Sequence, residues 1–480
     1  MRLLIATGAI ALLLAGPALA GGYDDAERCY TERDDLAKRL AACTAALDSG
    51  ELDTQGEAAT LVNRGITYRH LDKFDEAIAD YGKAIELSPR LASAYYNRGL
   101  LRMVRGEDSG AAEDFGATVT LMPDFAAGYF NRGAVYARLD YPDYAKADFA
   151  KAIALDPDNF DAYNARAEIS LKQGKSDEAA ADIEQLIRLA PEDKQLYLRL
   201  VELQRRQGDE AAVLAGLSRV LAKWPGEEAL RLERAEAYLK RGEDAKAAAD
   251  LDQLLADGSD EPVVHKLRGG LYEAEGDWRR AVANLSIAIE GGQGDAATLM
   301  ARARAHRALG DDISAMIDYD LALERDRNFA PALIARGQAR FRMGLFQPAI
   351  PDLTKGVQQS PDDIVPALWL YVAEERAKQD GSAALRATLR RLEPEGWAAA
   401  AAKLFLGQGT AGQVRAEAAA GDAAGKARRE CEASFFLGEH ALLQGDEAAA
   451  KQEFQAAIDG CAPETEAYRG AKAELSRLGA

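Results

Sequence analysis

The chain has 480 residues and a formal net charge of −19, from 59 Lys and Arg against 78 Asp and Glu. With 48% hydrophobic and 29% charged residues, its composition is that of a folded protein. The acidic balance argues against a general nucleic-acid-binding protein, which needs a basic face to neutralise phosphates. Four Cys and four His leave little room for a metal cluster, so we expect no metal and no cofactor.

The N-terminus has the pattern of a secretory signal peptide. Arg2 precedes an apolar run over residues 3–15, and the sequence Pro17-Ala18-Leu19-Ala20 supplies a cleavage site after Ala20. The run is too short to span a bilayer core of about 30 Å, which argues against a membrane anchor. No later segment is apolar for long enough to span a membrane. We therefore expect residues 1–20 to be removed and the mature chain to reside in a bacterial periplasm.

The four cysteines form two local pairs, one near each end of the chain. An exported chain permits disulfides, and the pairs would be Cys29–Cys43 and Cys431–Cys461. Four buried thiols are the alternative reading. The even count in local pairs favours disulfides.

A repeat of 34 residues dominates the middle of the sequence. The segments NRGITYRHLDKFDEAIADYGKAIELSP, NRGLLRMVRGEDSGAAEDFGATVTLMP and NRGAVYARLDYPDYAKADFAKAIALDP follow one another in register. The spacing is kept by prolines, glycines, alanines and aromatic residues: Pro89, Pro123, Pro157, Pro191 and Pro225; Gly65, Gly99 and Gly133; Ala77, Ala111, Ala145 and Ala179; Tyr81, Phe115 and Phe149. Such periodicity is typical of stacked helical hairpins.

This pattern resembles the tetratricopeptide repeat (TPR). The resemblance implies an all-α fold, a right-handed superhelical solenoid of helix-turn-helix repeats with N- and C-terminal capping helices. We expect an N-terminal cap or half repeat over residues 21–57 and nine consecutive units over residues 58–363. Gly65 and its equivalents let the second helix approach, and Gly106 and its equivalents end the first helix.

After residue 363 the repeat fades. We expect degenerate helical repeats over residues 364–430, with four helices near residues 366–378, 382–391, 395–406 and 410–420. A final TPR is expected over residues 431–464 and a capping helix over residues 465–480. The segments WLYVAEERAKQDGSAALRATLRR, EGWAAAAAKLFLGQG and CEASFFLGEHALLQGDEAAAKQEF resemble the C-terminal part of NlpI-type envelope adaptors. Unlike those proteins, this sequence has no lipid-anchor Cys and has many more repeats.

Residues for catalysis are not apparent. The sequence has no phosphate-binding Gly loop, no nucleophile elbow and no metal-binding His pair. Acidic pairs such as Asp75-Glu76 begin second helices, where they favour the helix dipole. We therefore expect a protein that is not an enzyme.

The resemblance places partner-binding residues on the first helices, which line the concave side of TPR arrays. In the first three units the corresponding positions are Val62, Ile66, Arg69, His70, Tyr96, Leu100, Met103, Phe130 and Arg138. These residues form a predicted apolar and aromatic wall, unless they pack in the core instead. A second, basic patch is predicted at Arg304, Arg307, Phe341 and Arg342, with solvated surface charge as the alternative.

The predicted function is that of a periplasmic scaffold or adaptor that binds a peptide segment or helix of other proteins in its groove. The partners would be cell-envelope or peptidoglycan enzymes. An accessory subunit of a secretion, pilus or polysaccharide-export machine is the alternative. A hydrolase hidden in residues 364–430 is disfavoured, because that segment holds no His or Cys.

Overall fold

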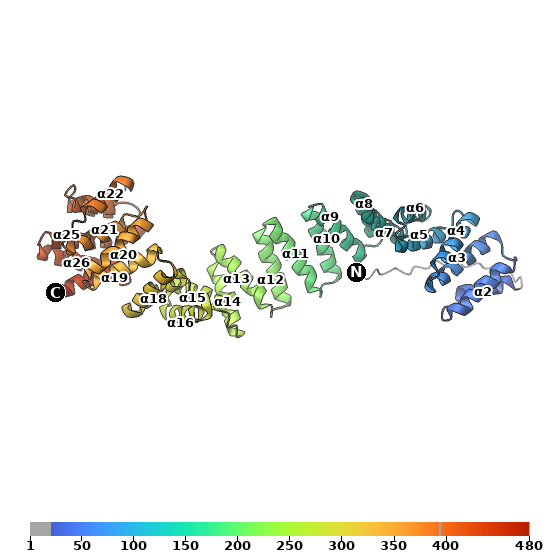
Figure 1. Ribbon diagram of the computed structural model, residues 1–480, viewed down its shortest axis with the longest axis horizontal. Coiled ribbons are helices and arrows are strands. Elements are labelled where there is room, and N and C mark those ends of the chain that lie inside the picture. The colour runs from blue at the N-terminus through green and yellow to red at the C-terminus, as the bar shows by residue number, and fades with distance from the viewer. Residues whose placement is uncertain (1–20, 393–394, 480) are drawn as a thin grey trace. The chain divides into compact units, whose positions relative to one another are not determined.

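Helices account for every regular element in residues 21–392 and 395–479, the part of the chain that the computed structural model describes. The predicted signal peptide, residues 1–20, lies outside this part. The chain divides into two compact units between Gly226 and Glu227, called unit 1 and unit 2 below. In both, successive helices pair into antiparallel hairpins, as the predicted all-α repeat solenoid requires (Figure 1).

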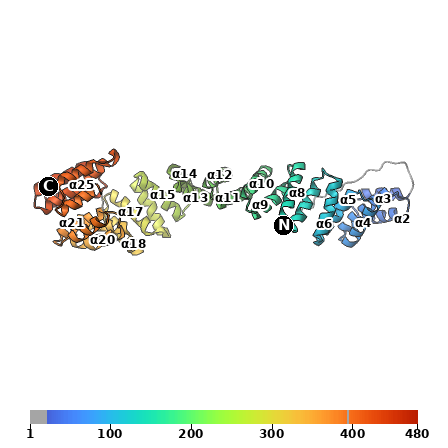
Figure 2. The same ribbon diagram turned by 90° about the horizontal axis from the view of Figure 1, so that it is seen from above.

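Unit 1 consists of helical hairpins that follow one another in chain order (Figure 2). Its N-terminal pair contains one helix more than the half repeat that the sequence predicts. The helices are α1 (Gly22–Thr31), α2 (Leu36–Asp48), α3 (Thr54–His70), α4 (Phe74–Leu87), α5 (Ala92–Arg105), α6 (Asp108–Leu121), α7 (Ala126–Arg138), α8 (Pro142–Leu155), α9 (Phe160–Lys172), α10 (Ser176–Leu189), α11 (Lys194–Gln207) and α12 (Glu210–Lys223).

Unit 2 continues the same arrangement of paired helices. Its elements are α13 (Glu228–Lys240), α14 (Asp244–Ala256), α15 (Pro262–Glu275), α16 (Trp278–Ala288), the π-helix η1 (Ile289–Gln293), α17 (Ala296–Ala308), α18 (Asp312–Arg325), α19 (Ala330–Arg342), α20 (Phe346–Gln359), α21 (Val365–Arg376), α22 (Ser382–Leu392), α23 (Trp397–Phe405), α24 (Ala411–Ala419), α25 (Ala423–Leu443), α26 (Glu447–Gly460) and α27 (Glu466–Arg477). The first helix of the last pair begins at Ala423 rather than near Cys431, because Asp422 caps it by accepting from the Gly425 N–H.

In the first hairpins of the array, a glycine of the first helix faces an aromatic ring of the second helix. A Cβ atom on Gly65 would lie 2.5 Å from the Tyr81 ring, and one on Gly99 would lie 3.0 Å from the Phe115 ring. Both aromatic rings are fully buried. The glycine and the aromatic residue both recur every 34 residues because the first and second helices of these hairpins approach closely at this contact.

Seven predicted glycine caps adopt the left-handed conformation at the end of a first helix, Gly106 among them with φ 77°. In the two units of the array that have Asp72 and Asp140 at this position, the aspartates take the same conformation, with φ 58° and 62°. The turn is thus fixed by the repeat geometry even where the residue is not glycine.

The last helices of unit 2 fold back on its middle repeats. Trp369 of α21 stacks on Phe435 of α25 with ring centroids 4.8 Å apart and meets Phe341 of α19 edge to face at 5.4 Å. These rings belong to one continuous core that also contains Trp397. Both tryptophans are therefore packing residues, which explains the apolar character of the degenerate segment.

Both predicted disulfides are present. Cys29 of α1 is bonded to Cys43 of α2, with 4.6 Å between their Cα atoms. Cys431 of α25 is bonded to Cys461 at the end of α26, with 5.2 Å between their Cα atoms. Each disulfide closes one helical hairpin.

Candidate functional site

A bidentate ion pair inside most repeats explains the recurrent arginines of the first helices. The arginine donates to an aspartate 16 residues later on the second helix, as Arg98 does to Asp114 through bonds of 2.7 and 3.0 Å. The pairs are Arg64–Asp80, Arg98–Asp114, Arg132–Asp148, Arg166–Asp182, Arg234–Asp250, Arg302–Asp318 and Arg336–Asp352. Because these aspartates are buried, the arginines belong to the scaffold and are not open to a ligand.

Four residues of the predicted apolar wall are buried. Val62, Tyr96, Leu100 and Met103 expose between 3% and 5% of their surface. The Tyr96 ring meets Phe125 edge to face with centroids 5.0 Å apart, and its hydroxyl accepts from Asn131 at 3.1 Å. The expectation of an open wall is wrong at these four positions, because their side chains fill the space between consecutive hairpins.

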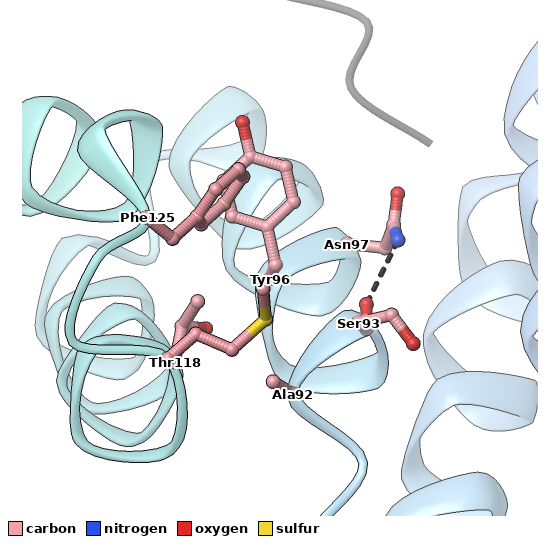
Figure 3. Close-up of a pocket in the computed structure, with 7 residues that line it drawn as sticks. Ala92, Ser93, Tyr96, Asn97, Thr118 and Phe125 are labelled. Carbon is pink, nitrogen blue, oxygen red and sulfur yellow. Dashed lines mark hydrogen bonds between the residues drawn. The ribbon is translucent and has the colours of Figure 1, made fainter. Parts of the chain in front are cut away.

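The space beside Tyr96 is too small for a ligand. Figure 3 shows Tyr96 and Phe125 lying against each other, with Thr118 and Ala92 below them. The pocket there has a volume of about 10 Å³, room for one water molecule. Asn97 donates to the carbonyl of Ser93 at 2.8 Å and accepts from Arg69 at 3.5 Å. The Asn97 side chain is therefore bonded within the repeat scaffold.

The other predicted wall residues remain at the surface. His70 and Arg138 are exposed, while Ile66, Arg69 and Phe130 are half-buried. Partial burial, followed by the charges of Arg69 and Arg39, lowers the pKa of His70, so this ring is neutral at pH 7. Val104, one residue after the buried Met103, is 53% exposed.

The residues of the predicted wall that remain at the surface lie on first helices that contact one another. Helix α3 contacts α5, α5 contacts α7 and α7 contacts α9. Arg138 of α7 donates to the carbonyl of Met103 in α5 at 2.8 Å and forms an ion pair with Asp108. We call Ile66, His70, Val104, Phe130 and Arg138 the inner surface of unit 1. Its apolar members are Ile66, Val104 and Phe130, and its polar members are His70 and the ion-paired Arg138.

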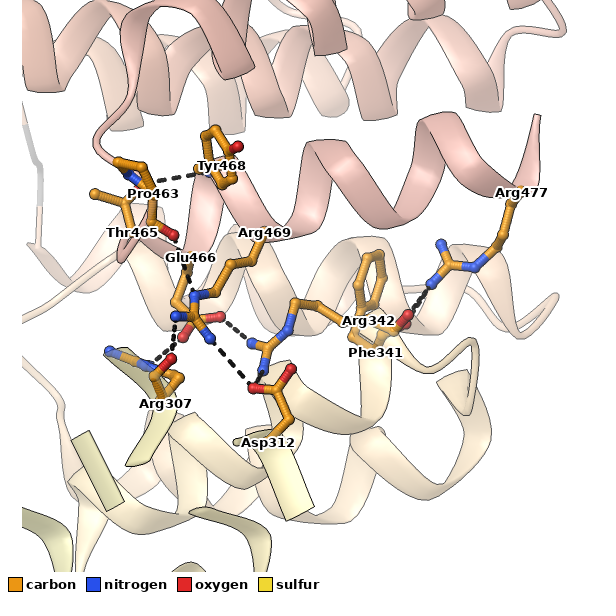
Figure 4. Close-up of polar contacts among 10 residues, drawn as sticks. All are labelled: Arg307, Asp312, Phe341, Arg342, Pro463, Thr465, Glu466, Tyr468, Arg469 and Arg477. Atoms are coloured by element: carbon orange, nitrogen blue, oxygen red, sulfur yellow. Dashed lines mark hydrogen bonds and ion pairs between the residues drawn. The ribbon is translucent and has the colours of Figure 1, made fainter. Parts of the chain in front are cut away.

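The predicted basic patch of unit 2 is occupied by the chain itself. Figure 4 shows Glu466, the first residue of α27, between Arg307 and Arg342. Phe341 is fully buried in the core, and Arg304 is paired with Glu273. The expectation of an open patch is therefore wrong, because α27 covers the guanidinium groups of Arg307 and Arg342 and Glu273 of α15 pairs with Arg304.

Sequence reasoning missed the charges that hold α27. Arg376 of α21 donates to Glu439 of α25 at 2.9 Å and to Glu474 of α27 at 3.1 Å. Both carboxylates are almost fully buried. Burial and the negative charge of Glu474 outweigh the ion pair and raise the pKa of Glu439 to about 8. The signal in the sequence was that two charged residues, Glu439 and Glu474, occupy helix positions that normally face the core.

The described ranges hold neither a cluster of metal ligands nor a membrane-spanning helix. Over residues 21–392 and 395–479, no three His, Cys, Asp or Glu side chains come close enough together to hold a metal ion. No helix in those ranges combines the length and the apolar character needed to cross a bilayer.

The family comparisons identify repeats in unit 1. A model described as TPR repeat matches residues 65–106, and models described as Tetratricopeptide repeat match residues 126–159, 149–181 and 170–212. Among solved structures, a tetratricopeptide repeat protein from Parabacteroides merdae ATCC 43184 is 23% identical, with 52% of this chain and 97% of that chain covered and a TM-score of 0.34. YrrB, a TPR protein with an unusual peptide-binding site, is 19% identical, with 40% and 96% covered and a TM-score of 0.34. The first TPR of Spaghetti (RPAP3), bound to an HSP90 peptide, is 29% identical, with 26% and 98% covered and a TM-score of 0.25. The family matches and the hairpins described above identify residues 65–106 and 126–212 as tetratricopeptide repeats.

Proposed function

We propose that this protein is a non-catalytic periplasmic scaffold that binds segments of partner proteins along the inner surface of unit 1. The partners are cell-envelope or peptidoglycan enzymes, which the scaffold brings together as an adaptor. Tetratricopeptide repeats and the C-terminal resemblance to envelope adaptors support this role. A fold alone does not determine which ligand a protein binds, so the proposal rests on the residues of the inner surface.

The inner surface carries the proposal because it combines exposure with chemistry that binds proteins. Val104 is a large apolar side chain left 53% exposed on a well-packed helix. Half-buried Ile66 lies on the neighbouring first helix α3, and half-buried Phe130 and exposed Arg138 lie on the neighbouring first helix α7. Aromatic, aliphatic and arginine side chains grouped in this way supply most of the binding energy at protein interfaces. A helix or an extended segment could bury them in one continuous contact.

The periplasmic location is supported by two independent features of the chain. Residues 1–20 have the pattern of a cleavable signal peptide. The two disulfides, which use all four cysteines, suit an oxidising compartment.

The test is affinity capture from a periplasmic extract, with bound proteins identified by mass spectrometry. The test variant His70→Glu/Val104→Glu places two negative charges on the inner surface. The control variant Thr120→Glu/Ala150→Glu adds the same charge to exposed positions on the second helices α6 and α8. Circular dichroism checks that both variants remain folded.

We expect the wild-type protein and the control to capture an envelope hydrolase or protease, and the test variant to lose it. Capture that survives unchanged in a folded test variant would refute the assignment of the inner surface. Capture of secretion, pilus or polysaccharide-export components instead would replace the adaptor role by that of an accessory subunit.

A further inference from the structure

Helix α18 carries two large apolar side chains that the fold leaves in contact with solvent. Ile313 is 76% exposed and Ile317 is 54% exposed. The two residues lie one helical turn apart, so they share one face of the helix. The half-buried Leu321 follows after one more turn and continues that face. Because the transfer of apolar surface out of water is favourable, this face of α18 favours association with another surface.

The exposed apolar surface extends from α18 onto the neighbouring helices. Asp312, which precedes Ile313, pairs with Arg342 at 3.4 Å, so the start of α18 adjoins the end of α19. Met343, which follows Arg342, is 51% exposed, and Leu309 at the end of α17 is 45% exposed. Single apolar residues are normal on a protein surface, whereas a cluster of them marks an interface. The cluster, called the α18 strip below, consists of Leu309, Ile313, Ile317, Leu321 and Met343.

Two charged side chains flank the α18 strip at opposite ends. Arg279 of α16 holds the repeat position of Ile313 in the preceding hairpin, and α16 and α18 both contact α17, so Arg279 lies on the side of the start of α18. Glu324 lies in the last turn of α18, where the helix dipole disfavours a negative charge. Both side chains are exposed, and within the described part of the chain neither has an ion-pair partner.

We propose that the α18 strip is a homodimer interface, in which α18 packs antiparallel against α18 of a second copy of this chain. A two-fold axis at Ile317 places this residue against the partner's Ile317, and Ile313 against the partner's Leu321. The same axis brings the partner's Glu324 toward Arg279.

A second copy is the occupant because a two-fold interface must be complementary to itself, and the α18 strip meets this condition twice. Its apolar residues recur at equal spacing on both sides of Ile317, and its unpaired positive and negative charges lie at opposite ends. The interface lies on unit 2, so it is independent of the inner surface of unit 1 and of the partners proposed for that surface.

The test is sedimentation equilibrium of the full chain without its predicted signal peptide, over a range of micromolar concentrations. Ile317→Asp places a negative charge at the two-fold axis. Tyr144→Asp is the matched control, because Tyr144 is a large side chain, 67% exposed, on the second helix α8 of unit 1. Circular dichroism checks that both variants remain folded.

We expect the wild-type protein and the control to dimerise equally in this range. Ile317→Asp should raise the dimer dissociation constant at least about a hundredfold, because the substitution occurs in both copies and burial of one isoleucine supplies at least about tenfold. Arg279→Glu and Glu324→Arg should each raise the dissociation constant by about twofold to tenfold. The double variant Arg279→Glu/Glu324→Arg should restore it, since the pair forms again with its signs exchanged.

A wild-type protein that stays monomeric throughout this range would overturn the proposal, as would a dimer that a folded Ile317→Asp variant leaves intact. Unchanged dissociation constants in both Arg279→Glu and Glu324→Arg would overturn the antiparallel arrangement. If Ile317→Asp fails to fold, Ile317→Ser replaces it, with a smaller shift expected in the same direction.

Discussion

Arg132 and Arg98 make the same bidentate pair in neighbouring repeats, but their loss should not cost the same. Among the described residues, Arg132 is the only arginine bonded to Asp148, through two bonds of 2.7 Å, and the aspartate side chain is 8% exposed. Asp114, which is 3% exposed, also accepts from Arg102 at 2.9 Å. Arg132→Leu therefore leaves a buried carboxylate without its partner, whereas Arg98→Leu leaves one that keeps a cation.

We expect Arg132→Leu to lower the free energy of unfolding by about 3 kcal/mol, near the lower end for breaking a buried pair. Arg98→Leu should cost about 1 to 2 kcal/mol, the scale of charge-assisted hydrogen bonds lost while the group stays paired. Arg132→Leu/Asp148→Ala should recover most of the loss, because it removes the stranded charge. The repeat with Leu200 and Gly216 at these positions shows that an apolar pair folds.

The assay is urea unfolding followed by far-ultraviolet circular dichroism, with the free energy extrapolated to water. The ratio between the two single variants matters more than either value. Equal losses for Arg98→Leu and Arg132→Leu would refute the argument from the second partner. A double variant as unstable as Arg132→Leu would refute the argument from the stranded carboxylate.

Three further predictions concern single features of the fold. The unfolded chain releases the Glu439 proton near pH 4.5 and the folded chain near pH 8, so wild-type stability should fall as the pH rises between these values. Glu439→Gln leaves Arg376, Glu474 and Arg477 in place and should remove that fall, which is on the order of a few kcal/mol in the free energy of unfolding. Urea titrations at pH 5 and pH 8 measure it. Gly65→Ala should lower the free energy of unfolding by about 1 to 3 kcal/mol, because the added methyl group overpacks against Tyr81. Gly82→Ala in α4 should raise the free energy of unfolding by about 0.5 to 1 kcal/mol, because no atom lies closer than 3.8 Å to the added group. Removing Cys431–Cys461 by double serine substitution should cost about 3 to 4 kcal/mol for a loop of this length, and unchanged stability on thermal unfolding would show that the hairpin needs no cross-link.

The architecture could be predicted because each repeat carries its own local signals. Gly65 and Tyr81 reserve the space for a close helix contact, and Gly106 ends a first helix in the left-handed conformation. These signals act within one hairpin and are therefore visible in one stretch of sequence. The first helix of the N-terminal hairpin, α1, was missed because its pairing depends on a neighbour and a disulfide rather than on the repeat pattern.

The candidate surfaces were harder to predict, because accessibility depends on contacts far apart in the sequence. Tyr96 and Met103 occupy positions that face a ligand in the TPR pattern, but the Phe125 ring beside Tyr96 and the packing of Met103 in the same core bury them. Nothing near Arg307 or Arg342 indicates that Glu466 covers them, because more than 100 residues separate the partners. The identity of a residue shows what its side chain can bind. It does not show which other part of the chain already covers that side chain.

The arginine–aspartate pairs also bear on how such an array can lengthen or shorten. Both partners come from one hairpin, 16 residues apart, so a 34-residue segment carries a complete, charge-balanced pair with it. Duplication of a segment adds a finished pair, and deletion removes one without stranding a carboxylate in its neighbour. Contacts between hairpins are of two kinds: Arg138 donates to the carbonyl of Met103, a backbone acceptor that any replacement repeat supplies, whereas Arg304 pairs with the side chain of Glu273. A change of repeat number therefore leaves the arginine–aspartate pairs of the remaining hairpins complete, and only the side-chain contacts between neighbouring hairpins need a matching change of sequence.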